Sequence, residues 1–431
     1  MRPARQLQAY LRMRREGRLS ADELARLQDE RVRAFVAAAY ESVPFVHDLL
    51  DSSGVAPADI RGASDLAMIP ITTKRQLQTT SLERLLAAGT DPRRCVRLST
   101  SGSSGIPLNL YFHPADFTRT NMNWFRAQTA WGIRPFHRAL EITGPHNFAG
   151  RRPWYQRLGL WRREQISVFE PVEAWAERWR SLRPDILYGY SGSLGLLARY
   201  ALERGPLVPR PKFVVGVSDL CPEPTAELIR EAFGREVIDL YGAAETGCIS
   251  WKCPRCRGYH INVDTLVLQV CDGGRTAGRG QRGRVIVTNL FSAAMPVLRY
   301  DLGDIARMSP DEPECGSGLP LLEIIEGRAD ALLTLPSGRV LSPMFFYATM
   351  KPVQGLDAWR VVQEENGSLT LLAVPSPDAS PDWPDLLRRR VIECLGEPAA
   401  VEVRPVDSLS PDASGKVRSV ISLKRQASEK P

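Results

Sequence analysis

Several features that identify common classes of protein are missing from this sequence of 431 residues. It contains no uncharged apolar run of about 18 residues or more, which excludes a membrane-spanning helix. No apolar segment follows the positive charges between Met1 and Gln6, so we expect no secretory signal and a cytoplasmic protein. The net charge is +7, but no pattern of an RRM, KH or helix-turn-helix module accompanies it. A solvated, arginine-rich surface is therefore favoured over a nucleic-acid groove.

Disulfides are not expected either, because a cytoplasmic chain rarely forms them, so clustered cysteines indicate metal or redox chemistry. Among the eight cysteines, Cys253 and Cys256 form a Cys-x-x-Cys pair, with Cys248 before it and His260 after it. Thiolates and imidazole at this spacing fit a tetrahedral structural zinc site, which these four residues could close locally. Unliganded thiols in a loop are the alternative. A redox centre is less favoured, because the strand-to-helix context of thioredoxin is absent.

The remaining composition, with 43% hydrophobic and 24% charged residues, is that of a globular protein with a large core and a smaller module. Apolar residues at helical spacing predict two helices between residues 4 and 50, interrupted at Gly17 and at Pro44. Further on, runs rich in β-branched residues alternate with helical stretches, which indicates an α/β core with mixed or parallel sheets. The expected elements are a helix over 224–233 and strands over 185–188, 212–217, 236–241, 263–270, 283–288, 331–335 and near 400.

One segment, Ser99-Thr100-Ser101-Gly102-Ser103-Ser104-Gly105-Ile106-Pro107, mixes hydroxyl residues with glycines and has no apolar side chain to bury before Ile106. Its flexible backbone, rich in N–H and O–H donors, suits the binding of a polyanion. It lacks the Gly-Lys-Ser/Thr ending of a Walker loop. Alone, such a run is typical of an ordinary loop, so its interpretation depends on what lies downstream.

Four motifs follow it in order, and they read Tyr241-Gly242-Ala243-Ala244-Glu245, Arg299-Tyr300-Asp301-Leu302-Gly303-Asp304, Gly327-Arg328-Ala329-Asp330 and Ser414-Gly415-Lys416. Together with the Ser/Gly run, they resemble the adenylate-forming superfamily, and within it the branch of phenylacetate-CoA ligases and CapK-like proteins. Val43-Pro44-Phe45 and Ile69-Pro70-Ile71-Thr72-Thr73-Lys74 also look like this branch, so the resemblance covers nearly the whole chain. It implies a large N-terminal α/β adenylation core with mixed sheets and a β subdomain over residues 1–327. A small, mobile α+β C-terminal domain over residues 328–431 would follow.

The resemblance implies an ATP-dependent ligase that converts a small carboxylic acid to an acyl- or aryl-adenylate and passes the acyl group to a thiol, with CoA as the expected co-substrate. An amide- or ester-forming ligase with an amine or hydroxyl acceptor is the alternative within the superfamily. A third interpretation is an inactive zinc-stabilised scaffold, against which the intact Glu245, Asp304, Arg328 and Lys416 argue. No nucleic-acid or membrane partner is expected, and a homodimer is compatible with the sequence. The sequence does not identify the acid.

The resemblance also assigns residues to the binding of ATP. Tyr241, beside Gly242, would stack on adenine, Asp304 would accept the ribose hydroxyls, and Arg328 would contact ribose and phosphate. The Ser/Gly run would wrap the β- and γ-phosphates through its main-chain N–H groups and hydroxyls, at Thr100, Ser101, Gly102, Ser103, Ser104 and Gly105.

The resemblance also implies catalytic roles for two further residues. Glu245 would hold Mg²⁺, and Lys416 would bridge the α-phosphate and the attacking carboxylate, carried by the C-terminal domain that hinges at Asp330. The chain departs from the family pattern at two nearby positions. Leu108 replaces a lysine after the Ser/Gly run, and Ala244 replaces the Thr or Ser that usually precedes the glutamate.

The acyl group is expected near His146, Tyr188 and Gly216, although Gly216-Val217-Ser218 replaces the usual Gly-Gly-Glu of the family. For zinc, some members of the branch add a downstream Cys-x-Cys-Gly turn, which here reads Pro313-Glu314-Cys315-Gly316. Because one cysteine of that turn is missing, Cys256 would supply the lost ligand. The preferred zinc ligands within the β subdomain, residues 245–320, are therefore Cys253, Cys256, His260 and Cys315, with Cys248 in reserve.

Overall fold

The computed structural model describes residues 3–99, 108–144, 148, 154–168, 170–218, 221, 223–328, 333–337, 340–341, 346, 349–350, 353, 355–410 and 419–423. The chain divides into two compact units. The first contains Met1–Phe136, Pro153–Trp161 and Ile238–Ile325, and the second contains His137–Arg152, Arg162–Val237 and Glu326–Pro431. Within the described ranges, no helix combines the length and the apolar character that are needed to cross a membrane.

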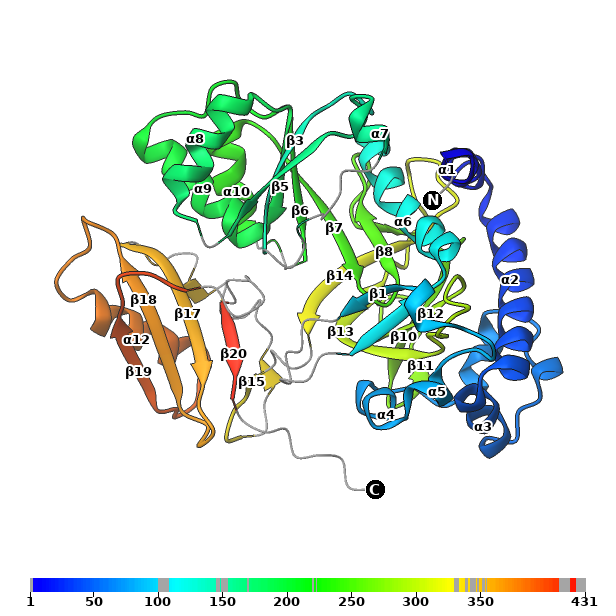
Figure 1. Ribbon diagram of the computed structural model, residues 1–431. Coiled ribbons are helices and arrows are strands. Elements are labelled where there is room, and N and C mark those ends of the chain that lie inside the picture. Colours follow the sequence, from blue (N-terminus) through cyan, green and yellow to red (C-terminus); the bar gives the residue numbers. More distant parts are fainter. Residues whose placement is uncertain are drawn as a thin grey trace. The chain divides into compact units, whose positions relative to one another are not determined.

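Three helices open the first unit, namely α1 (Pro3–Glu16), α2 (Ala21–Ser42) and α3 (Pro44–Ser52) (Figure 1). Helix α2 begins in a capping box, in which the Ser20 hydroxyl accepts from the Glu23 N–H and the Glu23 carboxylate accepts from the Ser20 N–H. Pro44 begins α3, because proline suits the first turn of a helix and disfavours helical backbone just before it. The predicted breaks at Gly17 and Pro44 are confirmed, but they separate three helices rather than two.

The rest of the first unit contains short helices, one long helix and many strands. Its further helices are η1 (Pro57–Asp59), η2 (Ser64–Met68), α4 (Lys74–Thr79), α5 (Leu82–Leu85), η3 (Pro92–Arg94), α6 (Pro114–Ala130) and α7 (Trp154–Arg157). Strands β1 (Val96–Ser99) and β2 (Asn109–Phe112) pair antiparallel. The larger sheet runs in the order β11-β10-β12-β13-β14-β9-β8-β7. Its strands are β7 (Val237–Ala243), β8 (Gly247–Lys252), β9 (Tyr259–Ile261), β10 (Leu266–Asp272), β11 (Arg275–Thr276), β12 (Arg282–Asn289), β13 (Tyr300–Met308) and β14 (Leu321–Arg328).

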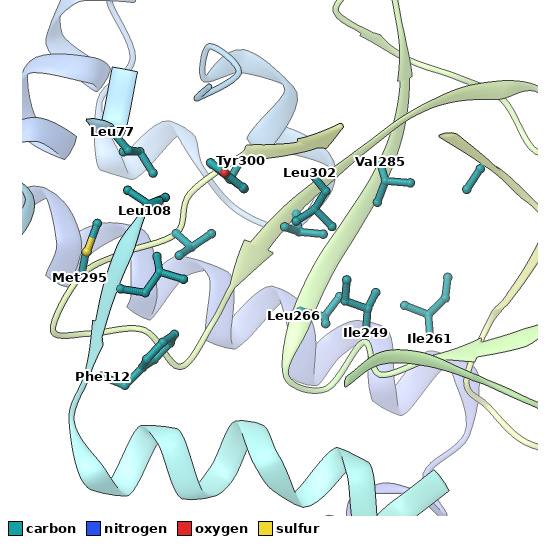
Figure 2. Packing of buried hydrophobic residues seen from close by; sticks show 14 of the residues in the cluster. Leu77, Leu108, Phe112, Ile249, Ile261, Leu266, Val285, Met295, Tyr300 and Leu302 are labelled. Carbon is teal, nitrogen blue, oxygen red and sulfur yellow. The ribbon is translucent and has the colours of Figure 1, made fainter. Parts of the chain in front are cut away.

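A buried core joins α4 and β2 to this sheet (Figure 2). Leu77 of α4, Leu108 and Phe112 at β2, and Val285 and Leu302 of the sheet are all buried in it. Burial of each such side chain contributes about 1.5–3 kcal/mol to folding. The strands predicted over 263–270 and 283–288 correspond to β10 and β12, so the expected β subdomain is a continuous antiparallel part of this unit.

The second unit contains a parallel sheet in the order β4-β3-β5-β6. Its strands are β3 (Ala139–Thr143), β4 (Arg163–Ser167), β5 (Ile186–Tyr190) and β6 (Phe213–Val217). Helices α8 (Val172–Leu182), α9 (Ser191–Arg204) and α10 (Glu223–Phe233) gather on one side of it (Figure 1). This alternation of strands and helices confirms the predicted α/β class with parallel strands.

The second unit also contains a smaller sheet in the order β19-β18-β17-β20. Its elements are β17 (Leu356–Gln363), β18 (Leu369–Pro375), β19 (Val401–Pro405), β20 (Val420–Ser422) and helix α12 (Trp383–Leu395), with the two-stranded β15 (Leu333–Thr334) and β16 (Val340–Leu341) beside them in sequence. Leu371, Leu387 and Val391 are fully buried in the core of this module. The predicted domain boundary, between residues 327 and 328, falls at the last residue of β14 and stays a prediction.

A buried ion pair ties the N-terminal helix to the body of the first unit. The Arg126 guanidinium, on α6, donates to both carboxylate oxygens of Asp264, with N···O distances of 2.7 and 2.5 Å. It also donates to the Asn262 Oδ1 at 2.9 Å and to the Met13 carbonyl at 3.2 Å. The side chains of Arg126 and Asp264 are only 7% and 1% exposed, so neither charge has water to replace its partner.

We therefore expect Arg126→Met to lower the free energy of unfolding by about 3–5 kcal/mol, because the Asp264 carboxylate would stay buried without a partner. Urea denaturation measures this change. Arg178→Met is the control, because Arg178 pairs with Glu164 while 46% exposed, and a pair of that kind contributes about 1 kcal/mol or less. Equal losses in the two variants would contradict the prediction.

Candidate functional site

The hairpin between β7 and β8 carries Glu245. The Thr246 N–H donates to the Ala243 carbonyl at 3.2 Å and closes the turn, and Glu245 inside it is 7% exposed. The pairing register shifts between Tyr241 and Gly242, as it does at a β-bulge. A bulge changes the direction in which the following side chains point, and such irregularities are common beside functional sites.

Helix α6 packs directly on the backbone of this hairpin. A Cβ atom at Gly242 would lie 2.6 Å from the Trp124 ring and 2.6 Å from the Gly247 carbonyl oxygen. A Cβ atom at Gly247, where φ is +69°, would lie 2.9 Å from the Thr120 side chain. Both glycines are therefore required by close approach, and the helix fixes the turn from behind.

The hydroxyl of Tyr241 donates to the Asp304 Oδ2 at 2.5 Å. The two residues come from β7 and β13, which β8, β9 and β14 separate in the sheet, so the sheet must curl to bring them together. The residues predicted to bind adenine and ribose thus lie in contact, and Gly242 and Glu245 follow in the same hairpin. The roles that the resemblance implies for these residues in binding a nucleotide stay predictions.

Other predicted nucleotide and catalytic residues lie outside the described ranges. These are Thr100, Ser101, Gly102, Ser103, Ser104, Gly105, the hinge residue Asp330 and the catalytic Lys416. Arg328 is the last residue of β14, so its backbone is placed. The roles of all these residues stay predictions.

The residues expected near the acyl group lie in the second unit. Tyr188 is buried in β5, with the Arg163 guanidinium 4.4 Å from its ring centroid. Tyr188 pairs with Val215 in the β5–β6 register, so position 216 lies on the opposite face of the sheet. The structure therefore does not bring Tyr188 and Gly216 to one face, and His146 lies outside the described residues.

Four of the five candidate zinc ligands come together in the first unit. One potential ligand atom from each of Cys253, Cys256, His260 and Cys315 lies within 4.8 Å of all the others. Cys248 is not among them, because its thiol is fully buried and points to the Ser250 carbonyl, with S···O at 3.6 Å. The geometry therefore favours the preferred ligand set over the local one.

We call Cys253, Cys256, His260 and Cys315 the Cys/His cluster. The hydrogen bonds around this cluster favour the binding of a cation. The Arg255 and Cys256 N–H groups donate to the Cys253 Sγ at 3.3 and 3.2 Å, and the Cys315 N–H donates to the Cys256 Sγ at 3.2 Å. Such N–H···S bonds favour the thiolate form, which is the form that binds metal. Burial raises the pKa of Cys256 to about 12 while no cation is bound, so metal binding has to displace that proton.

The orientation of His260 depends on a backbone group. Its Nδ1 lies 3.0 Å from the Leu319 carbonyl and its Nε2 lies 3.3 Å from the Cys315 Sγ. A carbonyl only accepts, so the proton belongs on Nδ1 and the lone pair of Nε2 faces the cluster. Burial lowers the pKa of His260 and keeps the ring neutral, as a metal ligand requires. Sequence reasoning missed Leu319, because a backbone carbonyl has no signature in residue type.

No protein-family model matches the chain. The phenylacetate-coenzyme A ligase of Thermus thermophilus is 28% identical over 372 residues, which cover 81% of this chain and 80% of that protein. The phenylacetate-coenzyme A ligase of Escherichia coli is 26% identical, over 73% of this chain and 74% of its own length.

Over most of its length, the chain is similar to phenylacetate-CoA ligases, a branch of the adenylate-forming superfamily. The fold agrees with this assignment. A crystal structure of 2-hydroxyisobutyryl-CoA ligase with an acyl-AMP superimposes with a TM-score of 0.79 at 21% identity, over 95% of this chain and 91% of that one. The recognition made from the ordered motifs is therefore confirmed, and so is the predicted α/β fold class.

The packing of α6 on the hairpin yields a direct test. Gly242→Ala should lower the free energy of unfolding by about 1–3 kcal/mol, because the added methyl group has to displace Trp124 or the hairpin backbone. Gly278→Ala is the control, since the nearest atom to a Cβ there is a side-chain oxygen of Gln281 at 3.5 Å. Urea denaturation compares the two variants, and equal stability would show that the contact is not tight.

Proposed function

We propose that the protein is an ATP-dependent carboxylate ligase that forms an acyl-adenylate and transfers the acyl group to CoA. In the first step a carboxylate oxygen attacks the α-phosphorus of ATP and pyrophosphate leaves. In the second step the CoA thiol attacks the acyl carbon, loses its proton, and AMP leaves. The observation that carries the proposal is the contact between Tyr241 and Asp304 beside the hairpin of Glu245, in a chain whose relatives are phenylacetate-CoA ligases.

Each placed residue has a chemical task that suits its type. The Asp304 carboxylate offers two acceptor oxygens for the ribose hydroxyls, and the Tyr241 hydroxyl holds one of them in position. The Glu245 carboxylate is a hard oxygen donor in a nearly buried turn, which fits Mg²⁺. When bound, that ion would offset the charge of the phosphates. Lys416 would add a cation where charge develops between the carboxylate and the α-phosphate.

The proposal gives the acid only as a class and names CoA as the acceptor. The relatives act on phenylacetate and the structural neighbour on 2-hydroxyisobutyrate, which supports a small carboxylic acid without selecting one. CoA is the proposed acceptor, because both kinds of neighbour are named as CoA ligases. Pyrophosphate release over a panel of acids, followed by acceptors added one at a time, tests both points. Product formation with an amine and none with CoA would replace the thioester proposal by the amide-forming alternative.

Lys416→Ala should nearly abolish acid-dependent exchange of pyrophosphate into ATP, while ATP binding stays within about threefold. A charge that acts chiefly in the transition state changes rate more than affinity. Lys424→Ala, a second lysine near the C-terminus, is the matched control. Exchange at the wild-type rate in Lys416→Ala would remove this residue from the mechanism.

We also propose that the Cys/His cluster binds a structural Zn²⁺. Three thiols and one imidazole are the ligands of closed, tetrahedral zinc sites, and the four ligand atoms here are close enough to share one ion. The ion would connect the segment before β9 to the segment before β14. In the sequence, the five strands β9 to β13 separate Cys256 from Cys315. Its contribution would be to folding rather than to the reaction.

Protein purified without chelator should contain about one zinc per chain. Cys315→Ser should lower both the zinc content and the melting temperature, because three ligands hold the ion less tightly than four. Cys248→Ser should keep its zinc, since that thiol lies outside the cluster. Elemental analysis and thermal unfolding measure the two effects. Wild-type protein free of zinc would refute the site, and full zinc in Cys315→Ser would refute this ligand set.

A further inference from the structure

A buried amide reaches the hairpin of Glu245 from the end of β12. Asn289 is 1% exposed, and its Nδ2 donates to the backbone carbonyl of Glu245 at 2.8 Å. Its Oδ1 accepts from the N–H of Phe291 at 2.9 Å. The side chain thus links the turn that carries Glu245 to the loop that follows β12.

These two contacts fix which way the amide points. An amide oxygen cannot donate to the Glu245 carbonyl, and an amide nitrogen cannot accept from the Phe291 N–H, so a flipped Asn289 would lose both bonds. The loss would be costly, because the groups are buried and have no water to replace them. Only asparagine combines a donor and an acceptor at this length.

The loop that holds Asn289 is itself well anchored. The Asn289 N–H donates to the Val297 carbonyl at 2.9 Å, and the Ser292 hydroxyl donates to the Asn289 carbonyl at 2.9 Å. The ring of Phe291 lies under the Arg119 guanidinium at 3.9 Å from its centroid. The amide therefore extends to the hairpin from a well-anchored loop, and it adds a second point of attachment to the turn that α6 contacts.

We propose that Asn289 is a positioning residue for Glu245. By holding the carbonyl of that residue, it fixes the backbone rotation that aims the carboxylate. The inference rests on the proposed function, in which Glu245 binds Mg²⁺ together with ATP. Loss of a hydrogen bond to a metal-ligating side chain typically changes metal affinity by about 10–100-fold, and for a bond to the backbone carbonyl of the ligand we expect the lower end of that range.

The test uses two variants of the full-length protein. Asn289→Ala removes the side chain, and Asn289→Asp keeps its size but places an acceptor against the Glu245 carbonyl. In both, the Mg²⁺ concentration for half-maximal pyrophosphate exchange should rise about tenfold, while the KM of the acid stays within about twofold. Wild-type Mg²⁺ dependence in folded Asn289→Asp would overturn the proposal.

Asn262→Ala separates positioning from stability. Asn262 is also a buried asparagine that donates to a hairpin carbonyl, that of Cys248 at 3.0 Å, but it does not contact Glu245. Asn262→Ala should lower the melting temperature without changing the Mg²⁺ dependence of pyrophosphate exchange. An equal shift of the Mg²⁺ dependence in Asn262→Ala would reduce the role of Asn289 to general support of the hairpin and would also overturn the proposal.

Glu245→Gln tells apart a failure of this inference from a failure of the proposed function. If wild-type protein shows acid-dependent exchange and Glu245→Gln weakens its Mg²⁺ dependence, the metal role stands and only Asn289 is in question. If Glu245→Gln leaves the Mg²⁺ dependence unchanged, the role assigned to Glu245 is wrong, whatever the Asn289 variants do.

Discussion

The close packing of α6 on strand β8 is the constraint on which the first unit depends. At one end of β8, Thr120 and Trp124 lie against the two glycines of the hairpin that carries Glu245. At the other end, the indole of Trp131, just after the helix, donates to the Lys252 carbonyl at 2.7 Å. Cys253 follows directly, so one helix sets both the candidate nucleotide residues and the start of the Cys/His cluster.

This arrangement explains why a structural metal would suit the far end of the strand. The segment from Cys253 to Gly258 has no regular structure to hold it, and Gly258 lies so close to the Leu322 carbonyl that a Cβ there would be 2.5 Å away. Leu321 pairs with His260 in the sheet, so Cys315 reaches the cluster over only a short loop. A metal ion bound at such a loop would restrict the unfolded chain and would hold the neighbouring strands β9 and β14 in register.

Candidate residues could be predicted from the sequence where the type of side chain carries the chemistry. Residues that act through contacts with backbone groups could not be predicted in this way. Tyr241 and Asp304 stand in ordered motifs and are in contact, and Cys253, Cys256, His260 and Cys315 lie together, while the roles of these residues stay predictions. Asn289 had no such signal, because an asparagine at a strand end is typical of a turn and its partner is a carbonyl 44 residues away. The third N-terminal helix was not predicted, because a proline such as Pro44 can mark the start of a new helix as well as the end of the preceding one.

Two departures from the family pattern have one physical consequence. Leu108 stands where a lysine is usual, and it is 4% exposed in the core shared with β2. Ala244 stands where a hydroxyl is usual, and it packs against the same core. Both changes exchange a polar contact for apolar burial beside the nucleotide residues. Under the proposed function, fewer groups of the protein would offset the charge of the phosphates, so the position of the Glu245 carboxylate, which would hold Mg²⁺, would matter more.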